Sequence, residues 1–115
     1  MSTYLLAIDA GTGSVRAVVF NTQGKQVGIY AQEWTHLAEA GVSGSMTFDA
    51  ATNWQITQTC IKGAIANAGI DGKQIVALSA SSMREGIVVY DAQGKAIWGV
   101  ANVDSRAGEQ VAQLN

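Results

Sequence analysis

Short apolar runs separated by turn residues occupy the first third of the chain. Tyr4–Ile8 and Val15–Phe20 are apolar and bounded by polar or glycine positions, as buried strands are, and Gln26–Trp34 suits a third strand. Residues 21–25 read Asn-Thr-Gln-Gly-Lys and suit a hairpin turn, because glycine readily takes a positive φ. The pattern predicts three sequential antiparallel strands.

The middle of the chain changes to a helical period. Residues 38–48 are rich in Gly and Ser and predict a loop, after which Asp49 is a plausible helix N-cap. Apolar side chains then recur at the spacing of one helix face, and Gly69 supplies a stop signal. We expect one amphipathic helix over residues 50–68.

A second set of strands follows the predicted helix. Ile75–Ala80 is expected to lie parallel to the first strand, because a helix makes the crossover. Residues 88–97 repeat the pattern of the first hairpin, and Asp104 or Ser105 can cap a helix that begins at Arg106. The prediction is an α/β fold: an antiparallel three-strand meander, a helix, a parallel strand, a hairpin and a helix.

Composition narrows the class of protein. The 115 residues are 48% apolar and 14% charged, which fits one domain with a single core. The net charge is -2 and there is no run of Lys or Arg, so we expect neither nucleic acid nor an anionic membrane as a partner. No apolar stretch reaches the roughly 20 residues of a membrane-spanning helix, and the start lacks the basic residues of a secretory signal. We expect a cytoplasmic protein.

Several conspicuous side chains are expected to pack and not to react. Cys60 is the only cysteine and lies in the predicted helix, so it should fill the core. His36 has no suggested nucleophile or metal partner, which favours a surface or packing role. Trp54, Trp98 and Phe48 are expected to be core residues.

A loop of small residues joins the first two predicted strands. Residues 9–16 read Asp-Ala-Gly-Thr-Gly-Ser-Val-Arg, so the backbone N–H groups of the loop can approach phosphate oxygens closely, and Thr12 and Ser14 add hydroxyl groups. Asp9 is expected to hold Mg²⁺ through water. Arg16 adds a permanent charge that can stabilise a phosphoryl group in transfer.

Other glycine loops do not match these residues. The dinucleotide pattern G-x-G-x-x-G fails because Arg16 occupies its last position, and the P-loop pattern fails for want of Gly-Lys-Ser/Thr. A tight turn without a ligand is the alternative interpretation of Gly11 and Gly13.

A charged pair follows the fourth predicted strand. Arg84 can donate to a hydroxyl group and Glu85 can accept from it, and open α/β sheets bind ligands at the carboxyl ends of their strands. A solvated salt bridge is the alternative for this pair. Asp104 could bind a hydroxyl or cap the last helix.

Residues 9–16 resemble the Asp-x-Gly-Thr-x-Ser-x-Arg signature of FGGY carbohydrate kinases, which share their fold with actin, hexokinase and the Hsp70 chaperones. Arg84–Glu85 is similar to the Arg-Glu pair that holds polyol hydroxyls in glycerol kinases. Residues 97–106 are similar to the family's Trp-x-Asp-x-Arg segment, with Asn102 in place of the Trp. The resemblance implies a ribonuclease H-like (actin-like ATPase) first domain. It also implies ATP and Mg²⁺ as cofactors.

The resemblance assigns roles to particular residues. ATP phosphates would be bound by Gly11, Thr12, Gly13, Ser14 and Arg16. The substrate would be contacted by Arg84, Glu85, Asn102 and Asp104. The amide of Asn102 replaces an aromatic wall, which puts glycerol and pentulose specificity in doubt.

Four segments together resemble the autoinducer-2 kinase branch of the family: residues 9–14, 44–49, 82–86 and 101–106. This implies transfer of the ATP γ-phosphoryl group to a hydroxyl of a small linear polyhydroxy ketone, the quorum-sensing signal derived from dihydroxypentanedione. The alternatives are another sugar or polyol kinase of the glycerol, xylulose or ribulose type, an actin-like or Hsp70-like ATPase, and a non-catalytic phosphate-binding fragment.

The resemblance also implies that residues 1–115 are only the N-terminal portion of the first of two actin-like kinase domains. The family's general base, an aspartate in a later motif, has no counterpart here, so we expect no kinase activity from this chain alone. An incomplete domain leaves a sheet edge unpaired and an apolar face uncovered. We therefore expect self-association.

Overall fold

The predicted meander is present in the structure, a computed structural model that describes residues 1–115. β1 (Tyr4–Ala10), β2 (Ser14–Asn21) and β3 (Gln26–Glu33) pair antiparallel in sequence order. In the turn between β2 and β3, the Asn21 side chain accepts a hydrogen bond of 2.9 Å from the N–H of Lys25. Gly24 has a φ of 81°, as the turn pattern predicts.

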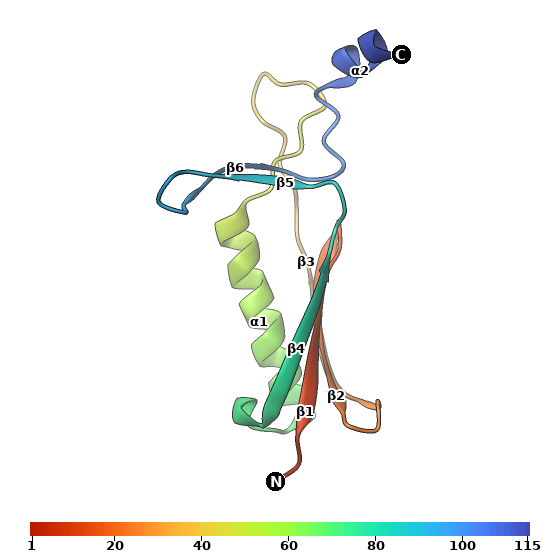
Figure 1. The fold of residues 1–115 in the computed structure, drawn as a ribbon, viewed down its shortest axis with the longest axis vertical. Helices are drawn as coiled ribbons and strands as arrows, with labels where there is room; N and C mark the ends of the chain where they lie inside the picture. The colour runs from red at the N-terminus through yellow and green to blue at the C-terminus, as the bar shows by residue number, and fades with distance from the viewer. The chain divides into compact units, whose positions relative to one another are not determined.

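A helical crossover completes the first sheet. α1 (Ala50–Ala68) leads to β4 (Ile75–Ser82), which pairs parallel to β1, so that the strand order is β3-β2-β1-β4 (Figure 1). The predicted stop is confirmed: Gly69 has a φ of 67° and the N–H of Ile70 donates to the carbonyl of Ile65, which is a Schellman motif.

A short 3-10 helix at Gly72–Gln74 (η1) precedes β4 and was not predicted from the sequence. Asp71 is its N-cap, because the Asp71 side chain accepts from the N–H of Lys73 and the Gln74 side chain accepts from the N–H of Asp71. The capping box therefore fixes the point at which the chain turns back into the sheet.

The helix packs on the sheet through small side chains. Asn53, Cys60 and Ala64 are the buried residues of α1, and their spacing of seven and four residues places them on one side of the helix. The burial predicted for Cys60 is confirmed. Trp54 lies about 100° further round the helix and is 56% exposed, so its predicted core position is wrong. On the sheet, the buried apolar residues are Leu6, Val15, Ala17 and Val19.

The remaining segments form a second compact unit, where the composition fits one domain, but every buried apolar residue except Ala101 belongs to the first unit. The first unit comprises residues 1–34 and 52–82, and the second comprises residues 35–51 and 83–115. In the second unit β5 (Ile87–Tyr90) and β6 (Ala96–Val100) form the predicted hairpin as a separate two-stranded sheet. This hairpin does not extend the four-stranded sheet.

The two hairpins share one turn chemistry. Asp91 accepts from the N–H of Lys95 at 2.9 Å, as Asn21 does from Lys25, and Gly94 has a φ of 80°. The internal similarity of the sequence is therefore the reuse of a turn.

The last helix, α2 (Gly108–Leu114), begins two residues later than predicted. Its N-cap is Ala107, which makes no capping hydrogen bond because alanine has no polar side chain. The Asp104 carboxylate instead accepts from the N–H of Arg106, upstream of the helix. The predicted cap at Asp104 or Ser105 is thus wrong.

The other two predicted core side chains, Trp98 and Phe48, differ in burial. Trp98 is exposed, which corrects the prediction, and Phe48 is half-buried with its ring centroid 5.9 Å from that of His36. The packing role expected for His36 agrees with this contact. Neither helix combines the length and the apolar character needed to cross a membrane.

A close contact between α1 and β3 gives a test of this packing. A Cβ atom added at Gly28 would overlap the carbonyl oxygen of Ala64 and lie 2.7 Å from Cβ of Ala68. We expect Gly28→Ala to lower the free energy of unfolding by about 1 to 3 kcal/mol or more, because the helix must move. Denaturant titration measures the change.

Gly13→Ala is the matched control, because no atom lies within 4 Å of its added Cβ and its φ is not left-handed. It should change the free energy of unfolding by less than about 1 kcal/mol. Equal effects at Gly13 and Gly28 would contradict the contact between α1 and β3.

Candidate functional site

The first part of the candidate site is a charged pair at the end of β1. Antiparallel register places Asp9 directly opposite Arg16 on β2, so their side chains share one face of the sheet. Nη2 of Arg16 lies 3.2 Å from Oδ2 of Asp9, and the two side chains are 52% and 54% exposed. Such an exposed ion pair contributes at most about 1 kcal/mol. A phosphate group could therefore displace Asp9 from Arg16 at little cost.

The loop between β1 and β2 is closed at its base and held from one side. The N–H of Gly11 donates to the carbonyl of Ser14 at 2.9 Å. The indole Nε1 of Trp34 lies 3.1 Å from the carbonyl oxygens of both Gly11 and Thr12, and the backbone N–H of Trp34 donates to Gly13 at 3.2 Å. Three successive loop carbonyls are thus bound by one residue.

The residues at this loop fit a magnesium ion bound mainly through water and phosphate. Asp9 supplies an exposed carboxylate, and the chain contains no cluster of three or more His, Cys, Asp or Glu side chains able to hold a metal. Mg²⁺ commonly binds to one or two carboxylates, substrate phosphates and water. A single carboxylate beside a phosphate loop matches that chemistry.

Arg84 and Glu85 lie in the exposed turn between β4 and β5. The two side chains do not form an ion pair with one another, so the structure does not support the salt-bridge alternative. Glu85 has a φ of 67° and is the one non-glycine residue of the chain with a positive φ. A backbone of this kind costs about 1 to 3 kcal/mol and is found preferentially at functional sites.

Asn102 lies in a tight turn that follows β6. The N–H of Asp104 donates to the carbonyl of Ala101 at 3.0 Å, which closes the turn and leaves Asn102 and Val103 exposed at its tip. The Asn102 side chain is therefore presented by a turn and not by the last helix.

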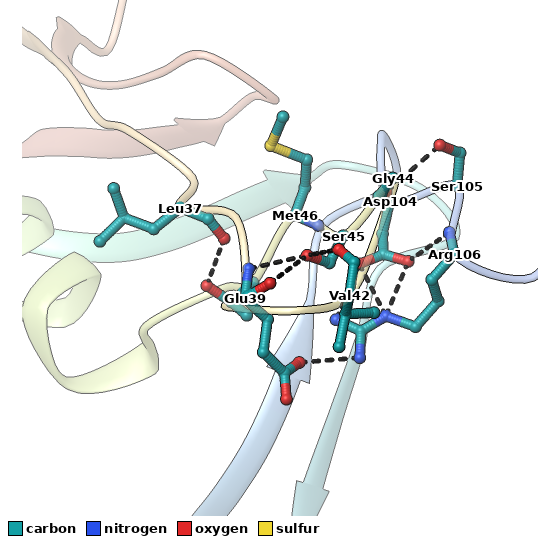
Figure 2. A network of polar contacts seen from close by, with 10 residues as sticks. Leu37, Glu39, Val42, Gly44, Ser45, Met46, Asp104, Ser105 and Arg106 are labelled. Atoms are coloured by element: carbon teal, nitrogen blue, oxygen red, sulfur yellow. Dashed lines mark hydrogen bonds and ion pairs between the residues drawn. The ribbon is translucent and has the colours of Figure 1, made fainter.

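Asp104 lies at the base of this turn, and both of its carboxylate oxygens are bonded (Figure 2). Oδ2 accepts from the N–H of Met46 at 2.6 Å, and Oδ1 accepts from the N–H of Arg106 at 3.1 Å. Nε of Arg106 lies 3.1 Å from both oxygens. The hydrogen bonds from Arg106 lower the pKa of Asp104 to about 2 from its ordinary value of 3.8.

Arg106 connects this turn to the loop before α1. Its Nη1 donates to Oε2 of Glu39 at 2.8 Å, and its guanidinium carbon lies 5.2 Å from the ring centroid of Trp98. Nη2 lies 3.0 Å from Asp104 Oδ2, close enough for charge attraction but not aligned for a hydrogen bond. The hydrogen bonds that Arg106 donates to Asp104 raise the pKa of Arg106.

The glycine- and serine-rich loop is therefore well ordered by partners. Ser45 is buried, and its hydroxyl accepts from the N–H of Glu39 at 2.7 Å and donates to the carbonyl of Val42 at 2.7 Å. The hydroxyl of Ser105 donates to the carbonyl of Gly44 at 3.2 Å (Figure 2), and the N–H of Ser105 donates to the same oxygen at 2.7 Å. These bonds join the loop to the residues around Asp104.

The structure divides the predicted site residues into two groups. Asp9, the residues at 11–14 and Arg16 gather at one end of the first unit. Arg84, Glu85, Asn102 and Asp104 belong to turns of the second unit.

Two residues with contacts to the site were not predicted from the sequence. Trp34 was expected only as the end of a strand, and Arg106 only as the start of a helix. The register of the meander could have identified Trp34, because pairing of Ser14 with Glu33 puts residue 34 beside residue 13. No comparable signal identifies the contact of Arg106 with Glu39, since the two residues come from distant segments.

Comparisons with known proteins show which family the chain is similar to. Residues 4–115 match the model of the FGGY family of carbohydrate kinases, N-terminal domain. The chain is 56% identical over 111 residues to an autoinducer-2 kinase of Salmonella typhimurium, covering 96% of this chain and 21% of that relative. It is 52% identical over 111 residues to an autoinducer-2 kinase of Escherichia coli K12, with the same coverage. The chain thus spans about a fifth of the length of these curated relatives.

Solved structures share the fold. A gluconate kinase from Lactobacillus acidophilus superposes with a TM-score of 0.86 at 20% identity, covering 98% of this chain and 22% of that one. A xylulose kinase from the same organism has a TM-score of 0.84 at 20% identity, covering 96% and 22%. These similarities confirm the predicted α/β, actin-like fold class, present here in part.

The lowered pKa of Asp104 makes a prediction for acid stability. A carboxyl group whose pKa falls from 3.8 to about 2 on folding adds to the free energy of unfolding above pH 3.8 and loses that contribution between pH 3.8 and about 2. We expect Asp104→Asn to destabilise the protein at pH 6 and to have progressively less effect towards pH 2. Denaturant titrations at several pH values measure this.

Glu109→Gln is the control, because Glu109 is exposed on α2 and forms no ion pair. It should cause little change at any pH. A difference between wild type and Asp104→Asn that stays constant from pH 6 to pH 2 would contradict the proposed linkage.

Proposed function

The chain belongs to the FGGY family of carbohydrate kinases, and from this membership we propose that it forms part of an ATP-dependent kinase for a small polyhydroxy substrate. The proposed reaction transfers the γ-phosphoryl group of ATP to a hydroxyl group of a small linear polyhydroxy ketone. The autoinducer-2 quorum-sensing signal is the proposed substrate. A cytoplasmic location remains a prediction.

The similarity to the curated relatives carries this proposal. Identity of 52 to 56% extends over 111 residues, or 96% of the chain. The proteins of the solved structures are named gluconate kinase and xylulose kinase, but at 20% identity to this chain they support only the fold. The proposal of a substrate therefore depends on the relatives named as autoinducer-2 kinases.

The first unit would bind the phosphates of ATP. We propose that the backbone of residues 11–14 and the hydroxyls of Thr12 and Ser14 contact phosphate oxygens, as the small size of the loop residues allows. Asp9 would hold Mg²⁺, which supplies positive charge against the phosphates. Arg16 lies 3.2 Å from Asp9 and so is close enough to stabilise charge on the transferring group.

The second unit would bind the acceptor. Arg84 and Asn102 can donate hydrogen bonds to hydroxyl oxygens, and Glu85 can accept from a hydroxyl group. All three are exposed at the tips of turns. Asp104 is also a proposed contact, but its carboxylate, 7% exposed, would have to share oxygens already bonded to Met46 and Arg106. We expect it to contribute less directly than the other three.

A chimeric kinase tests the function. Residues 4–115 would replace the matching segment of the Salmonella typhimurium autoinducer-2 kinase, and ATP-dependent phosphorylation of the ketone formed from dihydroxypentanedione would be measured. We expect activity in the chimera and none in the 115-residue chain alone. Activity on xylulose but not on the ketone would contradict the substrate, and no ATP-dependent phosphorylation of any polyol would contradict the kinase.

Arg84→Ala in the chimera tests the acceptor site. Loss of a charged hydrogen bond of about 1.5 to 3 kcal/mol should raise KM for the ketone at least tenfold and leave KM for ATP unchanged. Lys95→Ala is the control, because Lys95 is an exposed cation in the β5–β6 turn of the same unit. An unchanged KM for the ketone in Arg84→Ala would remove Arg84 from the site.

We also propose that the isolated chain self-associates through β4. This strand has a neighbour on one edge only, and its Val76 and Leu78 are 60% and 58% exposed. An unpaired strand edge with apolar side chains favours pairing with another chain.

Leu78→Lys should therefore shift the isolated chain towards monomer in sedimentation velocity, because a charge on an edge strand opposes pairing. Val111→Lys, an equally exposed apolar position on α2, should not. A monomeric wild-type chain at high concentration would contradict the proposal.

A further inference from the structure

The contacts of Trp34 give the phosphate loop an orientation. Along a regular strand successive carbonyl groups point to alternate sides. In the loop, the carbonyl oxygens of Gly11 and Thr12 both lie 3.1 Å from the single indole Nε1 of Trp34, and so both turn to the same side. The Gly13 carbonyl turns to the backbone N–H of Trp34 at 3.2 Å.

The direction of the carbonyls determines that of the amides. The chain has no cis peptide bond, and in a trans peptide unit the N–H points opposite to the C=O of the preceding residue. The N–H groups of Thr12, Gly13 and Ser14 therefore point away from Trp34. Successive N–H groups directed to one side form the kind of concavity that binds anions.

We infer that Trp34 is a positioning residue for phosphate binding, which holds the loop carbonyls on one side so that the loop amides point to the other. The inference rests on the proposed function and adds a residue that does not itself contact the ligand.

The surroundings of Trp34 suit this role. Its side chain is buried, so the indole ring cannot easily move, whereas the loop residues Gly13 and Ser14 are exposed. The β2–β3 register fixes its backbone, because Ser14 pairs with Glu33. A buried donor thus faces a loop of small residues.

A phenylalanine at position 34 tests the indole N–H donor separately from the buried aromatic ring. Trp34→Phe retains a buried aromatic side chain and the backbone N–H, and it removes only the Nε1–H donor. The carbonyls of Gly11 and Thr12 can then turn to water, and the amides lose their common direction. Trp54→Phe is the matched control, because Trp54 is an exposed tryptophan of the same unit.

The experiment uses ¹⁵N-labelled 115-residue chain and NMR titration with magnesium tripolyphosphate. We expect the wild type and Trp54→Phe to show shifts at the amides of residues 12–14, and Trp34→Phe to bind about tenfold more weakly. Equal affinity in Trp34→Phe and wild type would overturn the inference.

Backbone order without ligand distinguishes this inference from the proposed function. Order parameters at residues 11–14 should fall in Trp34→Phe and not in Trp54→Phe, whether or not phosphate binds. Unchanged order would overturn the positioning role. Failure of the wild type to bind tripolyphosphate, with reduced order in Trp34→Phe, would contradict the proposed phosphate site and leave the positioning role supported.

Hydrogen exchange of the wild type covers the case in which Trp34→Phe does not fold. The indole N–H of Trp34 should exchange with solvent at least tenfold more slowly than that of Trp54, because it is buried and bonded to the loop. Equal exchange rates would overturn the inference without any substitution.

Discussion

The register of the antiparallel meander is the constraint on which the candidate phosphate site depends. Pairing of β1 with β2 sets Asp9 opposite Arg16, and pairing of β2 with β3 sets the backbone of Trp34 beside Gly13. Side chains alternate along a strand, so a slip of one residue in the register would move side chains such as Asp9 and Arg16 to the other face of the sheet. The buried face formed by Leu6, Val15, Ala17 and Val19 opposes such a slip.

Close packing of α1 keeps that register in place. The helix approaches β3 through Gly28 and Ala64, where a single added methyl group would overlap backbone atoms. Small residues on the contact surface permit this approach, and the larger Trp54 lies on another side of the helix. The packing that stabilises the first unit is therefore also the packing that positions its loop.

The second unit depends on a different interaction. Asp104 and Arg106 join a turn that follows β6 to a loop that precedes α1, by hydrogen bonds to Met46 and Glu39. Charge-assisted bonds of this kind are stronger and more directional than neutral ones. They order a segment rich in Gly and Ser, whose composition by itself indicates flexibility.

Much of the fold could be predicted from local sequence signals. The helix bounds 50–68, the Gly69 stop, both hairpin turns and the parallel direction of β4 all follow from spacing and glycine chemistry. The family resemblance, carried by residues 9–16 and the Arg84–Glu85 pair, agrees with the family match over residues 4–115. Most of these features involve neighbours in the sequence, and the parallel direction of β4 follows from the helical crossover that precedes it.

Features that join distant segments were decided by tertiary structure alone. The contacts of Trp34 with residues 11–13 and of Asp104 with Met46 join parts of the chain far apart in sequence. The late start of α2 and the exposure of Trp54 were also decided by tertiary structure, because local spacing does not show which side of a helix packs or which partner a capping residue finds. Local patterns specify which element forms, whereas the partner of a side chain depends on how the elements pack.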